Sequence, residues 1–582
     1  MTSPNELPSS LPELIANLDL LLSNPSETEL DARLVETFTA QLLGQHLRPL
    51  IPTLVPLISP ALFVLRQDPT PLTNLLLHLL STTTFSEILL LTDQTTILQT
   101  LSAPSPPIQQ LGLSILQKAT LTVSDVGIVA FWYDVIKKLI EVLLLDEDTG
   151  IALKASEVLV GLLSVDLPAA GGTGLLWRRV LQDKGVYEVF FKLCSWNGDE
   201  LPGGKKSKTQ GQGRLLQFVA KVAALDLDAV ASSKVPEIDA KYTGDEAGRG
   251  LLGFAARYAV NIDEDVMMHM VLLDFYTLLL QGTSTTPELS SKALDYLEES
   301  GLHGSTVGRY LAPDAYSDDM IDQQFLESKA GEYIATFARL HPLRLLSSLA
   351  PAIPDPKNRR TSELSLEKPL VDVLLERIRF ILETNSRNPH TPSLDILSSL
   401  PISVLITDAG KRVVSMIPIA PPFPEYLDCL SNIISKTGNN RFMYDHYHST
   451  HPEMWHRITS YASALALRDV VLSCMRLIER LSIVQDSTGA YWGIKEVVTT
   501  PGVMSFLITP PQRFAGAARD PMSAAYTVAA RKLEVLETIL RVLGRAGSEI
   551  PGAEGWRVVV EERLKVGLWG NAAGGEVATM EM

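Results

Sequence analysis

Cysteine is scarce in this sequence, with only Cys194, Cys429 and Cys474 among 582 residues. Their wide spacing provides neither a disulfide framework nor a paired-thiol metal site. The amino-terminal stretch MTSPNELPSS also lacks the positively charged region of a secretory signal. We therefore predict a reduced, intracellular protein that is cytoplasmic, with the nucleus as a second location.

Basic residues are also fewer than acidic ones, 50 against 67. The formal net charge is −17, and residues 1–60 contain only Arg33 and Arg48 against seven acids. A protein that binds nucleic acid through phosphate contacts needs a basic face. We therefore expect no nucleic-acid partner.

Strand patterns and hairpin signals such as Asn-Gly between two β-rich runs are missing too. Helical patterns are abundant instead. In ETELDARLVETFTAQLL, residues 27–43, apolar residues recur at steps of three and four along one face. Segments of this kind end at Gly, Pro, Asn or Asp, and another then begins. The sequence predicts an all-α fold.

One type of helix recurs, with a small residue followed by apolar residues three and four positions later. It occurs at Gly112, Ala155, Ala293 and Cys474, at separations of 43, 138 and 181 residues. These are close to one, three and four units of about 45 residues, the period of armadillo and HEAT repeats. A small residue lets neighbouring helices cross closely. We predict a curved armadillo/HEAT-like α-solenoid of about a dozen degenerate units.

Three stretches break the helical pattern. NGDELPGGKKSKTQGQG, 197–213, is predicted to be a mobile insertion within an N-terminal arm, 1–350. The proline-rich stretch 351–369 is predicted to link that arm to a C-terminal arm, 370–570. Residues 571–582 are expected to form a disordered tail.

One uncharged run, PLIPTLVPLISPALFVL at 49–65, has the minimum length for a membrane span. Four prolines interrupt it. Proline removes a helical hydrogen bond, so we predict a buried, broken helical segment and no membrane association.

The stretch DHYHSTHPEMWH, 445–456, holds four of the ten histidines. Their spacings do not reproduce the HExxH pattern, in which two imidazoles share one helical face. Pro452 suits the first turn of a helix, which makes 445–451 a loop before a helix that starts near Glu453. We predict no metal and no cofactor here, although a histidine-dependent metalloenzyme is kept as an alternative.

Two glycine-rich stretches resemble phosphate-binding loops only in part. GDELPGGKKS, 198–207, misplaces either the lysine or the first glycine of a Walker A loop, and it lacks a preceding strand. GGTG, 171–174, has no phosphate-binding context. No nucleophile, base and orienting acid can be assembled, so we predict that the protein is not an enzyme.

The segment 477–540 gives a family resemblance. It contains a helix, a loop, a helix followed by TTPGVMSFLI, a spacer and a long Ala/Lys/Glu helix. This order resembles the C-terminal region of the 26S proteasome non-ATPase regulatory subunit five family and its fungal counterparts labelled as mismatch-repair proteins. The residues that match the family's pattern are Pro501, Gly502, Val503, Phe506 and Leu507. PPIQQLGLSILQKAT, 106–120, is similar to the family's early repeats.

The resemblance implies an assembly chaperone of the proteasome regulatory-particle base. Its partners would be the C-terminal domain of one ATPase subunit and other base subunits. The insertion at 197–213 and the prolines at 49–60 depart from the family. The alternative is an armadillo-like adaptor for another protein cargo, in trafficking or nuclear import.

For the partner-binding residues we select Tyr444, His446 and Trp455, because aromatic residues beside a loop–helix junction are typical interface anchors. Packing between neighbouring repeats is the alternative explanation for the same residues.

Overall fold

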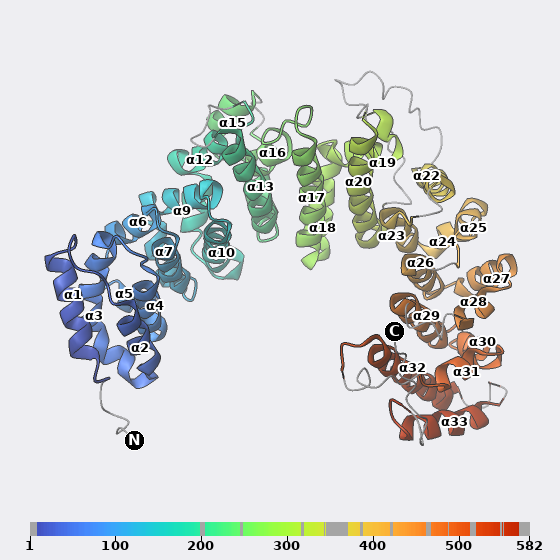
Figure 1. Ribbon diagram of the computed structural model, residues 1–582. Helices are drawn as coiled ribbons and strands as arrows, with labels where there is room; N and C mark the ends of the chain where they lie inside the picture. The colour runs from blue at the N-terminus through green and yellow to red at the C-terminus, as the bar shows by residue number, and fades with distance from the viewer. Residues whose placement is uncertain are drawn as a thin grey trace. The chain divides into compact units, whose positions relative to one another are not determined.

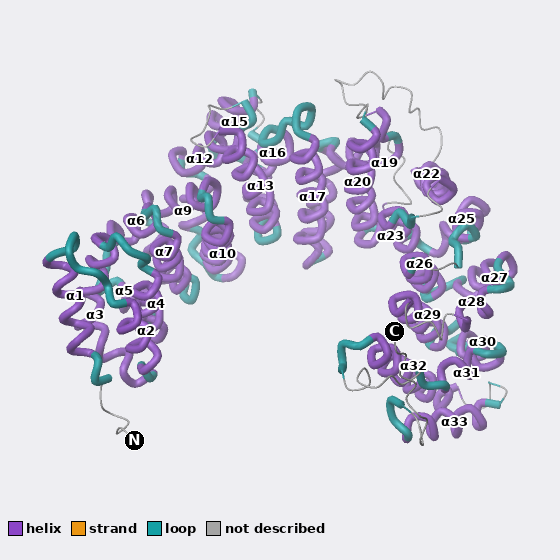
Figure 2. The backbone as a smooth tube through the Cα atoms, in the orientation of Figure 1, coloured by secondary structure: helices purple, strands orange, loops and turns teal. Residues whose placement is uncertain are grey.

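The protein is represented by a computed structural model. It describes residues 8–197, 204–244, 248–315, 319–342, 344, 370–384, 388–419, 423–460, 467–486, 488–511, 520–546, 550 and 552–569. Over these residues it consists of helices joined by turns and loops, without a strand (Figure 1, Figure 2). The chain divides into an N-terminal unit, Met1–Tyr296, and a C-terminal unit, Leu297–Met582. The all-α prediction is confirmed.

The helices of the N-terminal unit are α1 Leu11–Ser23, α2 Ala32–Gln41, α3 Gly44–Val64, α4 Thr70–Leu79, η1 Leu80–Thr82, α5 Phe85–Ile88, α6 Gln94–Ser102, α7 Pro106–Ala119, α8 Val123–Ala130, α9 Tyr133–Leu145, α10 Thr149–Val165, η2 Pro168–Ala170, α11 Leu175–Leu181, α12 Lys184–Cys194, α13 Gly204–Ala223, α14 Leu227–Ala231, α15 Pro236–Thr243, α16 Gly250–Arg257, α17 Val266–Gly282 and η3 Thr283–Thr285. Helix α18, Pro287–Glu299, runs across the division between the units.

The helices of the C-terminal unit are α19 Leu302–Leu311, η4 Pro313–Ala315, α20 Met320–Leu340, α22 Leu370–Thr384, α23 Thr391–Ser399, α24 Ile402–Leu405, α25 Asp408–Val414, α26 Pro424–Ile434, α27 Asn440–Thr450, α28 Met454–Ser460, α29 Arg468–Ser482, α30 Trp492–Thr499, α31 Val503–Ile508, α32 Ala524–Ala546 and α33 Ala553–Lys565.

Each unit stacks its helices in two layers. In the N-terminal unit α3, α4, α7, α10, α13 and α17 pack one on the next, while α6, α9, α12 and α15 form a second row behind them. In the C-terminal unit α20, α23, α26, α29 and α32 form the first row, which we call the C-terminal ladder (Figure 1). Helices such as α25, α27, α30 and α31 form the row behind it. Stacking in which each helix contacts its neighbours in the row is the solenoid architecture that the sequence predicts.

Small residues make the close helix crossings on which the repeat prediction depended. Ala155, Ala293 and Cys474 are each 0% exposed. A Cβ atom on Gly112 would lie 2.4 Å from the Thr100 hydroxyl oxygen, so α6 and α7 cross at a distance that only glycine allows. The period itself is irregular. The first residues of α7 and α10 are 43 apart, and those of α26 and α29 are 44 apart, but α10 and α13 differ by 55.

Helix α3 corrects the prediction of a broken segment at 49–65. It continues without a break for 21 residues with four prolines inside it. The prolines follow one another at steps of three, four and four residues, and all four are exposed, so the missing hydrogen bonds fall on one water-facing side. The opposite side is buried, as predicted.

Among the residues that the structure describes, two helical segments are long and apolar enough to span a membrane by length and composition, Gly44–Val64 and Val266–Thr285. Within the most apolar part of each, 44% and 56% is buried against the rest of the protein. These segments contribute to the packed core of the N-terminal unit.

The mobile insertion predicted at 197–213 is wrong for the part that the structure describes. Gly204 begins α13, a 20-residue helix with nine buried residues. Gly211 faces α9, where an added Cβ would lie 3.3 Å from the Leu144 carbonyl oxygen. Gly211 therefore allows close packing where the composition had suggested a flexible loop. Residues 198–203, the predicted linker 351–369 and the predicted tail 571–582 lie outside the described residues.

Candidate functional site

The histidine-rich segment is mostly helical, which corrects the predicted loop at 445–451. Asn440–Thr450 forms α27, and His451 is its C-cap residue. Pro452 therefore follows the end of one helix, while the next, α28, starts only at Met454. Proline is common just after a helix C-terminus because it cannot continue the helix. Pro452 has this role, and its predicted place in the first turn of a helix is wrong.

The polar side chains of this segment bind backbone carbonyl groups. His451 Nε2 lies 2.8 Å from the Ser415 carbonyl oxygen, and His446 Nε2 lies 2.8 Å from the Ser415 hydroxyl. The Tyr447 hydroxyl donates to the Ile417 carbonyl at 2.7 Å, and Arg457 donates to the Ile419 carbonyl at 3.0 Å. We call His451, Tyr447 and Arg457 the carbonyl clamp, since these three donors together fix the chain that leaves α25.

The other histidines point elsewhere. His448 stacks on Tyr444, with ring centroids 5.8 Å apart and planes within 10°, and His456 is exposed on α28. Across the described part of the chain, no group of three or more His, Cys, Asp or Glu side chains is placed to hold a metal ion. The imidazoles of His446 and His451 thus contact Ser415, while that of His448 stacks on Tyr444.

The selected partner-binding residues lie in or against the packing between helices. Tyr444 is 3% exposed and Trp455 is 5% exposed, and the Trp455 indole donates to the Tyr444 hydroxyl at 2.9 Å. His446 is half-buried on the Ser415 side. This arrangement matches the packing alternative, and contact of the three residues with a partner stays a prediction.

The GGTG stretch surrounds a carboxylate of the chain itself. Asp166 is 0% exposed and accepts from the backbone N–H groups of Thr173, Gly174 and Leu176, at 2.7–3.0 Å, and from the Thr173 hydroxyl at 2.6 Å. Convergent amides at the start of a helix bind anions, and here Asp166 is the anion they bind at the start of α11. The Walker-like stretch is also structural where it is described, since its residues 204–207 open α13.

A serine–histidine pair lies in the C-terminal unit, with the serine buried and the histidine half-buried. The Ser393 hydroxyl lies 2.7 Å from His390 Nδ1 and 2.8 Å from the Tyr310 hydroxyl, and Ser393 is 0% exposed. Burial, with a smaller contribution from Arg377, lowers the pKa of His390 to about 4, which keeps the imidazole neutral near pH 7. A fully enclosed hydroxyl cannot meet a substrate, so this pair ties α19 to the start of α23.

Charged side chains cross between successive helices of the C-terminal ladder. Arg476 of α29 pairs with Asp428 of α26 at 2.5 Å, and Arg531 of α32 pairs with Glu479 of α29. Arg531 also reaches Glu534 at 2.7 Å. These five residues and Arg480, which donates to Asn432 of α26, form what we call the charged strip.

The charged strip is partly exposed, and its most enclosed pair, Arg531 and Glu479, is 27% and 23% exposed. The side chains of Arg476 and Asp428 are 42% and 32% exposed, and that of Glu534 is 58% exposed. It carries three positive and three negative charges, so it offers paired donors and acceptors without a net field. Sequence periodicity carries no signal for it, because the pairs between helices join residues about 50 positions apart.

The strip has a counterpart at the start of the same ladder. Desolvation raises the pKa of the Asp395 carboxyl on α23, while Arg339 of α20 lowers it and Glu332 raises it. Both ends of the ladder therefore bring charges of both signs together across neighbouring helices. A face with this character suits a polar interface.

Comparison with known proteins gives structural likenesses only. No family model matches the sequence, and no curated protein matches it. Among solved structures, the karyopherin Kap121p bound to the SUMO protease Ulp1p matches with a TM-score of 0.43 and 11% identity, over 93% of this chain and 54% of that one.

Kap95p, in a structure with RanGDP, matches with a TM-score of 0.37 and 10% identity, over 97% of this chain and 80% of that one. An engineered protein matches with a TM-score of 0.32 and 14% identity, over 90% of this chain and 99% of that one. The chain spans about half the length of Kap121p (54%). Identities and scores this low transfer no function to this chain, which remains defined by its own all-α solenoid architecture.

Proposed function

We propose that this chain is a non-enzymatic assembly chaperone that binds the C-terminal domain of an ATPase subunit of the 26S proteasome regulatory-particle base. The C-terminal ladder is the proposed binding element. The chaperone would act in the cytoplasm, with the nucleus as a second location, and would contact other base subunits through its client.

The client assignment is supported by the resemblance in the C-terminal unit. Pro501 and Gly502 lie between α30 and α31, and Gly502 adopts φ +88°, a conformation that favours glycine. Val503, Phe506 and Leu507 are 0%, 6% and 0% exposed. The residues that carry the resemblance thus form the turn before α31 and pack α31 against the core. A family pattern would retain residues with such a structural role.

The charged strip is the single observation that carries the binding proposal. A chaperone must release its client, so its interface should be polar and non-obligate. Paired charges that remain half-exposed can exchange partners with a client at modest cost, because exposed ion pairs contribute only about 0–1 kcal/mol each. The ladder repeats this arrangement across α26, α29 and α32.

The experiment is a pull-down with tagged full-length chain from cell extract at low and moderate salt, with bound proteins identified by mass spectrometry. The proposal predicts recovery of one regulatory-particle ATPase with its neighbours, without the proteolytic core. A chain doubly substituted at Glu534→Lys and Arg476→Glu should recover less of it, while Lys495→Glu on α30, in the row behind, should not. Recovery of no ATPase would refute the client assignment.

A second candidate function is an adaptor for a basic protein cargo. It is favoured by an uneven charge distribution: residues 1–296 carry 21 basic and 34 acidic residues, a net −13, against −4 for residues 297–582. An acidic surface attracts a basic partner at low ionic strength. Recovery of basic cargo whose binding falls steeply with salt, and without any ATPase, would favour the adaptor.

A further inference from the structure

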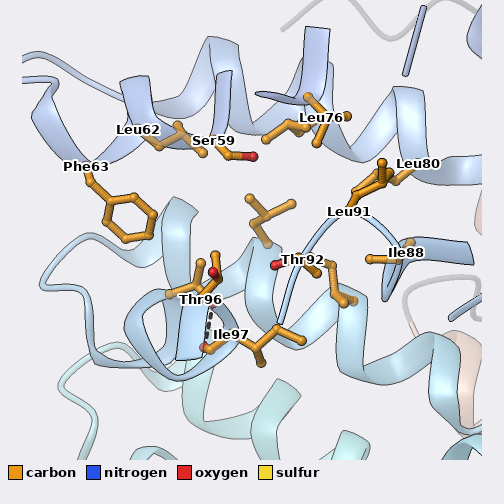
Figure 3. A pocket seen from close by; sticks show the side chains of 14 residues that line it. Ser59, Leu62, Phe63, Leu76, Leu80, Ile88, Leu91, Thr92, Thr96 and Ile97 are labelled. Carbon is orange, nitrogen blue, oxygen red and sulfur yellow. Dashed lines mark hydrogen bonds between the residues drawn. The ribbon is translucent and has the colours of Figure 1, made fainter. Parts of the chain in front are cut away.

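An apolar cavity lies within the first helices of the N-terminal unit, between α3, α4, α6 and α7 (Figure 3). It has a volume of about 40 Å³. Figure 3 shows Phe63 of α3 and Leu91, which precedes α6, on opposite sides of it. Both belong to the rim, because Phe63 is 44% exposed and Leu91 is 40% exposed.

The lining bears no charge. Ten of its fourteen side chains are hydrocarbons, and the other four are hydroxyl residues. Two of these hydroxyls have partners inside the protein: Thr96 donates to Asp93 at 2.7 Å, and Thr100 donates to the Ile97 carbonyl at 2.7 Å. A charged group would lose its hydration in this cavity with no opposite charge to compensate for it. The part of a ligand that enters it is therefore hydrocarbon.

The size of the cavity selects the kind of ligand. Engineered apolar cavities that bind benzene are about 150 Å³, so this one is too small for an aromatic ring or an acyl chain. It has room for the tip of a branched aliphatic side chain. A free molecule with so few atoms makes too few contacts to bind tightly, whereas a side chain is held in place by the rest of its protein.

The surroundings indicate the charge of that protein. Residues 1–150 contain sixteen acidic and six basic residues, a net −10. Asp93 stands directly beside the cavity residues Thr92 and Thr96, and its carboxylate is exposed. The backbone N–H and hydroxyl of Thr96 hold the pKa of Asp93 below its usual value, so it is ionised near neutral pH.

We propose that this cavity is a docking site for a basic segment of a partner protein, which inserts one branched aliphatic side chain between Phe63 and Leu91. Lysine or arginine residues beside that side chain face Asp93. This site lies in the N-terminal unit, and it does not depend on the client of the C-terminal ladder.

The test is a selection of 12-residue peptides from a display library, with the full-length chain as bait. Ser59→Phe fills the cavity from α3, and Thr92→Leu fills it from the opposite side, should the first variant not fold. Ser114→Phe is the matched control, because Ser114 is a half-buried serine of α7 that does not line the cavity. Asp93→Asn removes the charge and keeps a side chain that can cap α6.

The expected peptides share a leucine, isoleucine or valine with lysine or arginine beside it. Their affinity should fall at least tenfold for Ser59→Phe or Thr92→Leu, fall about threefold for Asp93→Asn, and be unchanged for Ser114→Phe. The proposal is overturned if no selected peptide is sensitive to cavity filling, or if the peptides are acidic. It is also overturned if the cavity mediates self-association or binding to phosphatidylcholine vesicles, each lost in Ser59→Phe.

Discussion

The imidazole Nε2 of His451 lies 2.8 Å from the carbonyl oxygen of Ser415, and this contact joins the first residue after α27 to the first residue after α25. With the other donors of the carbonyl clamp, it satisfies backbone acceptors at the end of a seven-residue helix that cannot bind them itself. The histidine-rich segment, which looked like a metal site, is thus explained by the packing of one repeat on the next.

Substitution of His451 by alanine should therefore lower the free energy of unfolding by about 1–2 kcal/mol, because a carbonyl acceptor loses its donor. His456→Ala, at an exposed position, should change it by less than about 0.5 kcal/mol. Urea denaturation followed by circular dichroism measures both. A shift of the wild-type transition with added zinc, abolished in His451→Ala, would contradict the clamp.

Asp166→Ala should be among the most destabilising single substitutions in the N-terminal unit. It removes a buried carboxylate that accepts four hydrogen bonds and leaves the backbone N–H groups of Thr173 and Leu176 without an acceptor, a loss of about 2–4 kcal/mol. The Gly174 N–H keeps its bond to the backbone carbonyl of residue 166. Asp148→Ala removes only an exposed cap of α10 and should cost about 1 kcal/mol. Denaturation measures the free energy of unfolding of both variants. Equal losses of this free energy would show that the GGTG turn does not depend on the Asp166 carboxylate.

Stability should fall as the pH falls from about 6.5 to about 4. Burial, and to a lesser degree Arg344, lowers the pKa of His303 to about 4 from its ordinary value of 6.5. Between these two pH values His303 is protonated in the unfolded chain but not in the folded chain, so protonation favours unfolding. His303 could contribute about 2–3 kcal/mol to the change.

The check is the denaturation midpoint at pH 7 and pH 4.5 for the wild type and for His303→Gln. The variant keeps a polar group near the Tyr333 hydroxyl, which lies 2.9 Å from the imidazole, and it should lose less stability on acidification. An equal acid sensitivity in both proteins would assign the effect to other groups.

Two glycines in neighbouring helices should respond oppositely to larger side chains. Gly112→Val should destabilise the protein by about 1–3 kcal/mol, because its side chain would meet Thr100 where α6 and α7 cross. Gly127→Ala in α8 should stabilise it by about 0.5–1 kcal/mol, since nothing lies within 4 Å of the added Cβ and alanine is the better helix former. Thermal melting of both variants measures the difference, and destabilisation by both would argue against this packing.

Periodicity predicted the fold class well because helices in a solenoid bury one face against immediate neighbours in the sequence. The apolar face of 27–43 is one example, as Val35 and Phe38 are both 0% exposed. The small residue at Gly112 also marked a true crossing. Such local signals survive in any sequence that folds by stacking.

Proline and glycine residues led to wrong predictions where their role depends on how helices pack. The prolines of α3 face water along one side of an intact helix, and Gly211 lets α13 approach α9. Composition cannot distinguish these uses from loops. The charged strip was out of reach for another reason, because which residues pair across helices depends on how the repeats stack.

The central claim is that the C-terminal ladder holds the C-terminal domain of a regulatory-particle ATPase. The most direct measurement places a photo-crosslinking amino acid at Glu534, on the ladder, and at Lys495, on α30 in the row behind, and irradiates each full-length chain with the purified ATPase domains. The account predicts a cross-link from position 534 to one ATPase and none from position 495. Cross-linking from position 495 alone, or from neither position, would contradict it.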